Sequence, residues 1–106
     1  MKKKSYGLAK LEKYRESIFT DDLKICYICN QRGIYRPASE KHEILYGSNR
    51  RNSMKYGYVL PLCRKCHDSF HKNRVLTEIW CKKCQTYHEN KYGVKDWMDH
   101  FHKSYK

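Results

Sequence analysis

Hydrophobic residues alternate with polar ones in the middle of the chain, at the period of a β-strand. In KHEILYGSN (residues 41–49) the His, the Ile and the Tyr alternate with the Glu and the Leu, which predicts a strand that ends at Gly47. Residues 58–62 (YVLPL) predict a second strand, and Pro61 indicates that it is an edge strand or that it ends there. The polar residues 48–57 between the two strands are expected to form a loop.

Helical spacing of hydrophobic residues predicts helices on both sides of these strands. An amphipathic helix is expected over residues 7–19, and another is expected to begin near Cys63 and to stop at Asn73. Two more are predicted over residues 75–92 and 94–101, separated by a glycine. A short sheet with several helices indicates an α+β fold.

The six cysteines form three Cys-x2-Cys pairs, Cys26/Cys29, Cys63/Cys66 and Cys81/Cys84. A chain of 106 residues with a mean hydropathy of −0.99 buries only a small core, so a bound metal would add needed stability. No apolar leader follows the first lysines and no segment is long enough to span a bilayer, so a cytoplasmic location without membrane association is expected. Paired cysteines in that compartment typically bind structural Zn²⁺.

Two pairings of these cysteines are plausible. The first joins Cys26, Cys29, Cys63 and Cys66, and we favour it because it fastens both ends of the predicted strand pair. Gly33 would let the first knuckle reverse, with a short strand at Ile34-Tyr35 ended by Pro37. The alternative joins the second and third pairs, separated by fourteen residues, but it would break the helix that begins at the second pair.

The third pair, Cys81 and Cys84, would then remain outside the zinc site. We expect these residues to be small, buried, reduced thiols. The alternative is a second zinc ion that they share with His88, which lies four residues after Cys84. His88, His100 and His102 are otherwise expected on the surface.

The chain is strongly basic, with a formal net charge of +12. Residues 41–74 hold eight Lys or Arg against two acidic residues, a net charge of +6 in about a third of the chain. Such a balance indicates a polyanionic partner, most often nucleic acid, although a solvated basic surface is the alternative. The residues expected to contact the DNA backbone are Arg50, Arg51, Lys55, Lys65 and Lys72.

Three histidines coincide with this basic segment. His67 and His71 are four residues apart, so a helix would place both on one face, and His42 lies on the first predicted strand beside Glu43. A base, nitrogen ligands for a metal and cations for phosphate are what metal-assisted phosphodiester hydrolysis needs. The alternatives are that His67 is a structural zinc ligand and that His42 is an ordinary strand residue.

Together these motifs resemble the HNH endonuclease superfamily. The shared features are two Cys-x2-Cys knuckles, a His-bearing strand, a loop with Asn, a second strand, and a helix that opens Leu-Cys-x2-Cys-His-x3-His. The run HEILYGSNRRNSMKYGYVLPLCRKCH is similar to a small phage-encoded group that includes recombination-enhancing nucleases. The resemblance is close over residues 25–73 and looser over 79–105. It implies a small zinc-stapled ββα-metal domain, treble-clef-like, with flanking helices.

The resemblance also implies roles for individual residues. His67 and His71 would bind the catalytic divalent metal (Mg²⁺, Mn²⁺, Ni²⁺ or Zn²⁺), and His42 would be the general base. The Asn that usually orients the base is replaced by Tyr at its position, so Asn49 in the loop, or secondly Asn52, would take its role.

One position departs from the superfamily pattern. An Asp or His ligand usually stands directly before the base, and here that residue is Lys41. Either Glu40 or Glu43 takes the place of this ligand, or His42 is itself the ligand and Glu43 is the base.

The expected organisation is an N-terminal basic arm or helix (1–24), the HNH core (25–74) and a C-terminal helical extension (75–106). The expected function is metal-dependent cleavage of DNA with low sequence specificity, in phage or prophage DNA processing or recombination. A monomer is expected, in the cytoplasm of the host, with a recombinase or another phage replication or recombination protein as a further partner. The alternatives are a non-catalytic zinc-stabilised DNA-binding module and a zinc-containing protein-interaction adaptor.

Overall fold

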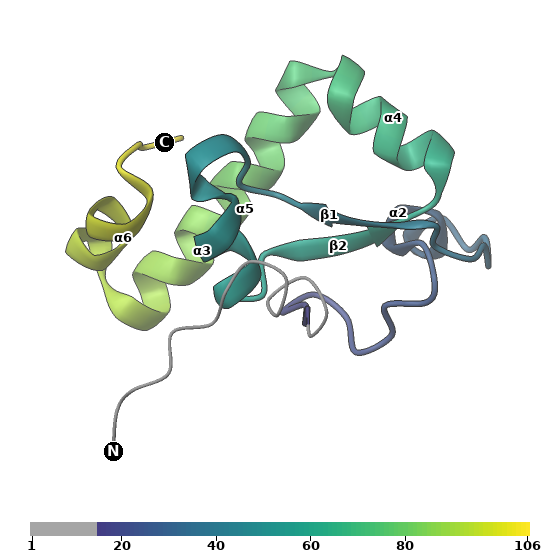
Figure 1. Cartoon of the computed structure of the whole chain (residues 1–106), viewed down its shortest axis with the longest axis horizontal. Helices are drawn as coiled ribbons and strands as arrows, with labels where there is room; N and C mark the ends of the chain where they lie inside the picture. The colour runs from purple at the N-terminus through teal and green to yellow at the C-terminus, as the bar shows by residue number, and fades with distance from the viewer. Residues whose placement is uncertain (1–14) are drawn as a thin grey trace.

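A two-stranded antiparallel sheet runs through the middle of the protein in the computed structural model, which describes residues 15–106 (Figure 1). Its strands are β1 (Glu40–Glu43) and β2 (Val59–Leu62), and His42 lies opposite Leu60. Pro61 is tolerated opposite Lys41 because each strand of a two-stranded sheet has an unpaired edge. The sheet carries His42 on its buried side.

Helices surround the sheet in the described part of the chain. They are α2 (Tyr27–Gln31), the 3-10 helix η1 (Gly47–Asn49), α3 (Arg50–Lys55), α4 (Arg64–Lys72), α5 (Arg74–Tyr92) and α6 (Val94–Phe101). Helix α4 contacts both strands, α5 continues from it, and α6 folds back against α5 (Figure 1). Within residues 15–106, no helix is both long and apolar enough to cross a membrane.

The boundaries of the last three helices follow local sequence signals, as predicted. Asn73 ends α4 and caps α5, since its side-chain oxygen accepts a hydrogen bond from the Leu76 N–H at 3.0 Å. Gly93 ends α5 with a φ of 102°, a conformation that favours glycine, and α6 begins at once. The predicted helices after the second strand are therefore confirmed.

The expectation of a loop over residues 48–57 is wrong, because η1 and α3 occupy most of it. Ser53 and Met54 are buried on α3, so this polar segment packs against the sheet as a helix. Tyr46, predicted on the same face as His42, is 53% exposed, while Leu45 is buried. The strand alternation stops because β1 ends at Glu43.

Two predictions in the N-terminal half also need correction. Residues 15–19 are not helical, and residues 7–14 of the predicted helix lie outside the described part of the chain. Ile34 and Tyr35 are exposed and form no strand; the β-bridge instead joins Ile25 to Pro37. The knuckle is closed by this bridge rather than by a strand.

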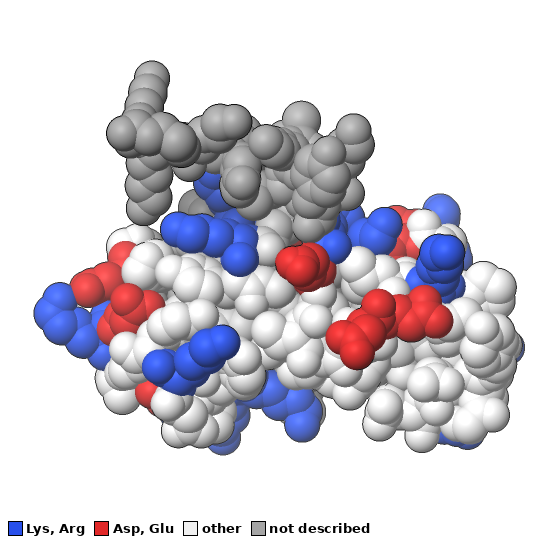
Figure 2. All heavy atoms as spheres, turned by 90° about the horizontal axis from the view of Figure 1, so that it is seen from below, with Lys and Arg blue, Asp and Glu red and all other residues white. Residues whose placement is uncertain are grey.

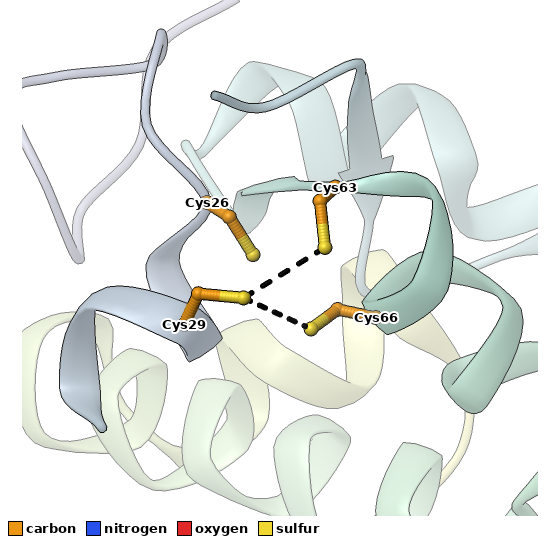
Figure 3. A group of neighbouring side chains, drawn as sticks. All are labelled: Cys26, Cys29, Cys63 and Cys66. Atoms are coloured by element: carbon orange, nitrogen blue, oxygen red, sulfur yellow. Dashed lines mark hydrogen bonds between the residues drawn. The ribbon is translucent and has the colours of Figure 1, made fainter. Parts of the chain in front are cut away.

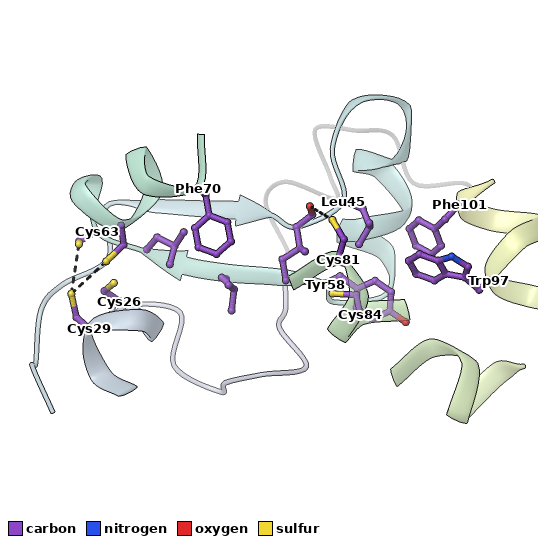
Figure 4. Packing of buried hydrophobic residues seen from close by; sticks show 14 residues of the cluster. Cys26, Cys29, Leu45, Tyr58, Cys63, Phe70, Cys81, Cys84, Trp97 and Phe101 are labelled. Atoms are coloured by element: carbon purple, nitrogen blue, oxygen red, sulfur yellow. Dashed lines mark hydrogen bonds between the residues drawn. The ribbon is translucent and has the colours of Figure 1, made fainter. Parts of the chain in front are cut away.

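Buried side chains form one continuous cluster from the cysteine-rich end of the sheet to α6 (Figure 4). Phe70 of α4 lies in the middle, and the stacked rings of Trp97 and Phe101, with centroids 4.2 Å apart, close the far end. Phe19 adds to the cluster from the N-terminal segment, with its ring centroid 5.2 Å from that of Trp80. Helix α6 is thus part of the core and not a detached extension.

Ser53 connects two buried backbone groups. Its hydroxyl donates to the Tyr58 carbonyl at 2.6 Å and accepts from the Leu45 N–H at 3.1 Å. We expect Ser53→Ala to lower the free energy of unfolding by about 1–3 kcal/mol, since the Leu45 N–H would lose its acceptor away from water and the Tyr58 carbonyl would keep only the Ile44 N–H. Denaturant unfolding measures this; the exposed Ser69→Ala should change little, and equal stability of the two variants would contradict the prediction.

Candidate metal and active site

Four cysteine thiols meet where α2 approaches the start of α4 (Figure 3). This four-cysteine group consists of the first two Cys-x2-Cys pairs, as predicted, and all four sulfur atoms lie within 4.8 Å of one another. Cys29 Sγ is 3.8 Å from Cys63 Sγ and 3.7 Å from Cys66 Sγ. Tetrahedral zinc with Zn–S bonds of about 2.3 Å has a sulfur–sulfur edge of about 3.8 Å. The buried group, in which no cysteine is in a disulfide, could hold a structural metal such as zinc.

The local backbone shapes the first knuckle. The Cys26 N–H donates to the Arg36 carbonyl at 2.8 Å, and the Ile34 N–H donates to the Cys29 carbonyl at 2.9 Å. Gly33, with a φ of 78°, allows the chain to reverse between them. Arg36 then returns with Nη1 3.7 Å from Cys29 Sγ, where its charge balances that of thiolate ligands. Arg36 reaches the four-cysteine group only because the chain reverses at Gly33. The spacing of the cysteines in the sequence did not indicate this contact.

The third cysteine pair lies elsewhere, on α5. Cys81 and Cys84 are fully buried, and Cys81 Sγ is 3.5 Å from the Ile44 carbonyl. Burial raises the pKa of Cys81 to about 11, so the group remains a protonated thiol. The expectation of small buried thiols is confirmed.

Three histidine rings converge between β1 and α4. The ring centroid of His42 lies 5.1 Å from that of His67 and 6.1 Å from that of His71, and the latter two are 4.5 Å apart. His67 directly follows the last member of the four-cysteine group, so the same helix start carries both features. The three residues that the sequence singled out are brought together.

His42 is the most buried of the three and is 8% exposed. Its ring packs on Phe70, with centroids 4.7 Å apart, and its buried Nε2 makes no hydrogen bond within the described part of the protein. Burial first, and then the charges of His67 and His71, lower the pKa of His42 from 6.5 to about 4. The imidazole is therefore neutral near pH 7, with a nitrogen that can accept a proton.

The other two histidines lie on the side of α4 that faces His42. The carboxylate of Glu40 lies 3.4 Å from His67 Nδ1, and its other oxygen lies 3.6 Å from Arg64. A carboxylate at one ring nitrogen favours the tautomer in which the other nitrogen is free to bind a metal. Glu40 thus supports His67 from the position just before Lys41.

Glu43 is held between two arginines. Its carboxylate accepts a hydrogen bond from Arg50 Nε at 2.7 Å and lies 3.2 Å from Arg15 Nε. The Glu43 side chain is 11% exposed, and both of its carboxylate oxygens lie at guanidinium groups. Arg15, placed by sequence in the N-terminal helix, is a site residue that local patterns could not reveal.

An open hollow of about 620 Å³ lies over these residues. Its lining includes His42, His67 and His71, the carboxylates of Glu40 and Glu43, and the cations Arg15, Lys41 and Arg50. Three histidines and two arginines thus line one space, which suits an anionic group such as a phosphodiester.

The loop asparagines do not reach this hollow, contrary to expectation. Asn49 donates from Nδ2 to the Phe101 carbonyl at 3.0 Å, and Asn52 donates to the His100 carbonyl at 3.0 Å. Both amides therefore satisfy the last carbonyls of α6, which lie about fifty residues away in the chain. The prediction that Asn49 orients the base is wrong for this arrangement.

The predicted DNA contacts are spread over two helices. Arg50 lines the hollow, whereas Arg51, Lys55, Lys65 and Lys72 are exposed on α3 and α4 and are not part of its lining. On the face seen in Figure 2, blue Lys and Arg side chains of the described residues are interleaved with red Asp and Glu. The positive charge of that face is divided into separate patches.

Among residues 15–106, only two groups of three or more His, Cys, Asp or Glu residues have all their ligand atoms within 4.8 Å. One is the four-cysteine group and the other is His88, Asp96 and His100. The three histidines of the hollow do not form such a group within the described residues. No family model, curated protein or solved structure matches the chain.

Proposed function

We propose that the protein is a metal-dependent DNA endonuclease built on an HNH-type ββα-metal core with a treble-clef-like zinc site. The observation that carries the proposal is the neutral, mostly buried His42, whose ring lies beside the His67/His71 pair and lines a hollow with cations in the described part of the chain. The order β1, β2 and α4, with cysteine knuckles at the start of α2 and of α4, supports the same core.

His67 and His71 would hold the catalytic divalent ion. They are adjacent on one face of α4, and Glu40 at His67 Nδ1 favours a free Nε2 on that ring. Two nitrogen ligands suit Zn²⁺, Ni²⁺ or Mn²⁺ and leave coordination positions for oxygen atoms of the substrate. When bound, the ion would polarise the phosphate and stabilise the leaving oxygen.

His42 is the residue that accepts a proton from the attacking water. Its neutral ring has an accepting nitrogen, and packing on Phe70 fixes its orientation. The proton would reside on the imidazole ring until it passes to solvent through the open hollow that His42 lines. Glu43 positions Arg15 and Arg50 rather than acting as the base.

The arginines hold the phosphate. Arg50 and Arg15 share the carboxylate of Glu43, so their guanidinium groups are fixed at the edge of the hollow. They stabilise the negative charge that builds up on the phosphoryl oxygens during attack. Such contacts address the backbone and not the bases, so low sequence specificity follows. A phage or prophage role in DNA processing or recombination, with a recombinase partner, belongs to the same proposal.

A plasmid-nicking assay with the purified full chain tests the proposal. We expect supercoiled plasmid to be converted to nicked or linear DNA with at least one of Mg²⁺, Mn²⁺, Ni²⁺ or Zn²⁺, and chelator to stop the reaction. If no ion supports cleavage, with or without a recombinase, the enzyme proposal fails. Salt-dependent binding without cleavage would then favour a zinc-stabilised DNA-binding module.

Arg50→Gln should weaken DNA binding several-fold, by a similar factor for unrelated sequences. The change removes a cation that lines the hollow, so the slope of log affinity against log salt should fall by about one. Fluorescence anisotropy at several salt concentrations measures both effects. Arg74→Gln is the matched control, since Arg74 is also paired with a glutamate (Glu78) but lies exposed on α5. Equal effects of the two changes would contradict a specific role for Arg50.

A further inference from the structure

A second cluster of metal-ligating side chains lies at the corner between α5 and α6, and the proposed nuclease does not use it. His88 comes from α5, while Asp96 and His100 are four residues apart on α6 and so face the same way. His88 Nε2 is 2.6 Å from Asp96 Oδ2, and His100 Nδ1 is 3.3 Å from the same oxygen. All three ligand atoms lie within 4.8 Å of one another.

His88 was expected on the surface, but it is fully buried. Its ring lies among Tyr56, Tyr58, Tyr92 and Trp97, with the nearest of these ring centroids, that of Tyr92, 4.6 Å away. Asp96 and His100 are about one-third exposed, at 35% and 31% of their side chains. The cluster thus has a buried anchor and a side that faces solvent.

A tyrosine hydroxyl lies within hydrogen-bonding distance of the second ring nitrogen of each histidine, the one that does not lie at Asp96. Tyr58 Oη is 2.6 Å from His88 Nδ1, and Tyr56 Oη is 3.2 Å from His100 Nε2. Metal-binding histidines almost always have their second nitrogen hydrogen-bonded in this way, which fixes the ring and its tautomer. The remaining nitrogens both lie at Asp96. His88 Nε2 contacts its carboxylate, while His100 Nδ1 is 2.9 Å from its backbone carbonyl and 3.3 Å from Oδ2, so an ion would compete with that carbonyl for His100.

From this arrangement we infer that His88, Asp96 and His100 form a second binding site for a divalent transition ion, with Zn²⁺ as the expected occupant. Two imidazoles and one carboxylate match zinc's preference for nitrogen and oxygen ligands. The one-third exposed side leaves the fourth position to water. Binding would replace the hydrogen bond between His88 Nε2 and Asp96 Oδ2, would widen their 2.6 Å separation, and would release the proton of that hydrogen bond to solvent.

The position gives the ion a structural effect. Asn49 and Asn52 donate hydrogen bonds to the last carbonyls of α6, so α6 supports α3. The second site would join α6 to α5. Helix α3 carries Arg50 at the edge of the hollow. Metal at this corner would stabilise the C-terminal helices independently of whether the chain cuts DNA.

The test counts zinc in protein that cannot use the proposed nuclease ligands. The parent is the full chain with His67→Gln and His71→Gln, dialysed against a weak chelator that leaves zinc in the four-cysteine group. Calorimetric titration with Zn²⁺ should show one further equivalent per chain. Co²⁺ at this site should give visible bands without the charge-transfer absorption expected of thiolate ligands.

Two variants of the parent locate that equivalent. Asp96→Asn and His100→Gln should lose it, while Asp99→Asn, an exposed carboxylate on the same helix, should keep it. Zinc retained in the four-cysteine group and a cooperative melt show that each variant is folded. If Asp96→Asn unfolds, His100→Gln alone tests the site. No second equivalent in the parent, or binding that survives both changes, would overturn the site.

Discussion

Replacing Cys29 with serine should abolish the cooperative thermal unfolding of the protein. Cys29 Sγ lies 3.8 and 3.7 Å from two other sulfur atoms of the four-cysteine group, so its loss opens the whole ligand set. Zinc contributes about 10–16 kcal/mol in zinc-finger peptides, as much as the entire stability of about 5–15 kcal/mol of a typical domain. Removing this contribution from a small basic chain should leave it largely unfolded.

Zinc content and circular dichroism during heating measure the effect together. Wild-type protein should carry tightly bound zinc and melt cooperatively, and strong chelator should reproduce the behaviour of Cys29→Ser. Cys81→Ala is the matched control, because it also replaces a fully buried cysteine but one outside the four-cysteine group. The Cys81→Ala variant should keep its zinc and lose only the packing contacts of the Cys81 side chain. A Cys29→Ser protein that melts like wild type would show that the four thiols do not act as one site.

The elements set by local signals were predictable from sequence. The strand period located β1 and β2, and Asn73 and Gly93 act as caps through their own side chain or backbone freedom. The first two cysteine pairs could be joined because they enclose the predicted strand pair, while the other pairing would break the helix that begins at the second pair. Each of these inferences depends on residues close together in the chain.

The errors concern residues whose partners lie far away. The sequence predicts Asn49 in a polar loop, but its amide donates to a carbonyl 52 residues later. His88 carries no hydrophobic signal, yet aromatic rings from the end of α3, from α6 and from the segment before β2 enclose it. Periodicity cannot show such contacts, because tertiary packing and not local preference decides them.

The candidate site likewise combines features that local sequence patterns predict with features that depend on distant contacts. The i and i+4 spacing placed His67 and His71 together, and strand alternation turned His42 towards the core. The sequence could not show that Glu43 pairs with Arg15, since this ion pair joins segments 28 residues apart. The structure shows that Glu43 is paired with two guanidinium groups, which favours the proposal that His42 is the base.

Replacing His42 with glutamine should lower the rate of DNA cleavage by about 10²-fold or more while leaving DNA binding intact. Glutamine fills most of the space beside Phe70, so the buried position should not collapse. The amide cannot accept a proton from water at neutral pH, which removes the base alone. Single-turnover cleavage and anisotropy with the same DNA separate the two effects.

The metal ligands should respond differently. His71→Ala removes one of two nitrogens from the proposed ion site, so activity should fall and partly recover as the metal concentration is raised. His42→Gln should show no such recovery, because its defect is not in metal affinity. His102→Asn is a control on an exposed histidine, with φ of 60°, a conformation that Asn tolerates.

The comparison with Glu43→Gln decides between the two candidate bases. If Glu43 only positions Arg15 and Arg50, its replacement should weaken DNA binding and lower the rate modestly, with metal affinity unchanged. The opposite result is equally clear. Loss of metal affinity in His42→Gln, with Glu43→Gln losing turnover but neither metal nor DNA, would make His42 a ligand and Glu43 the base. Both carboxylate oxygens of Glu43 already face guanidinium groups, so we expect the first pattern, with His42 accepting the proton.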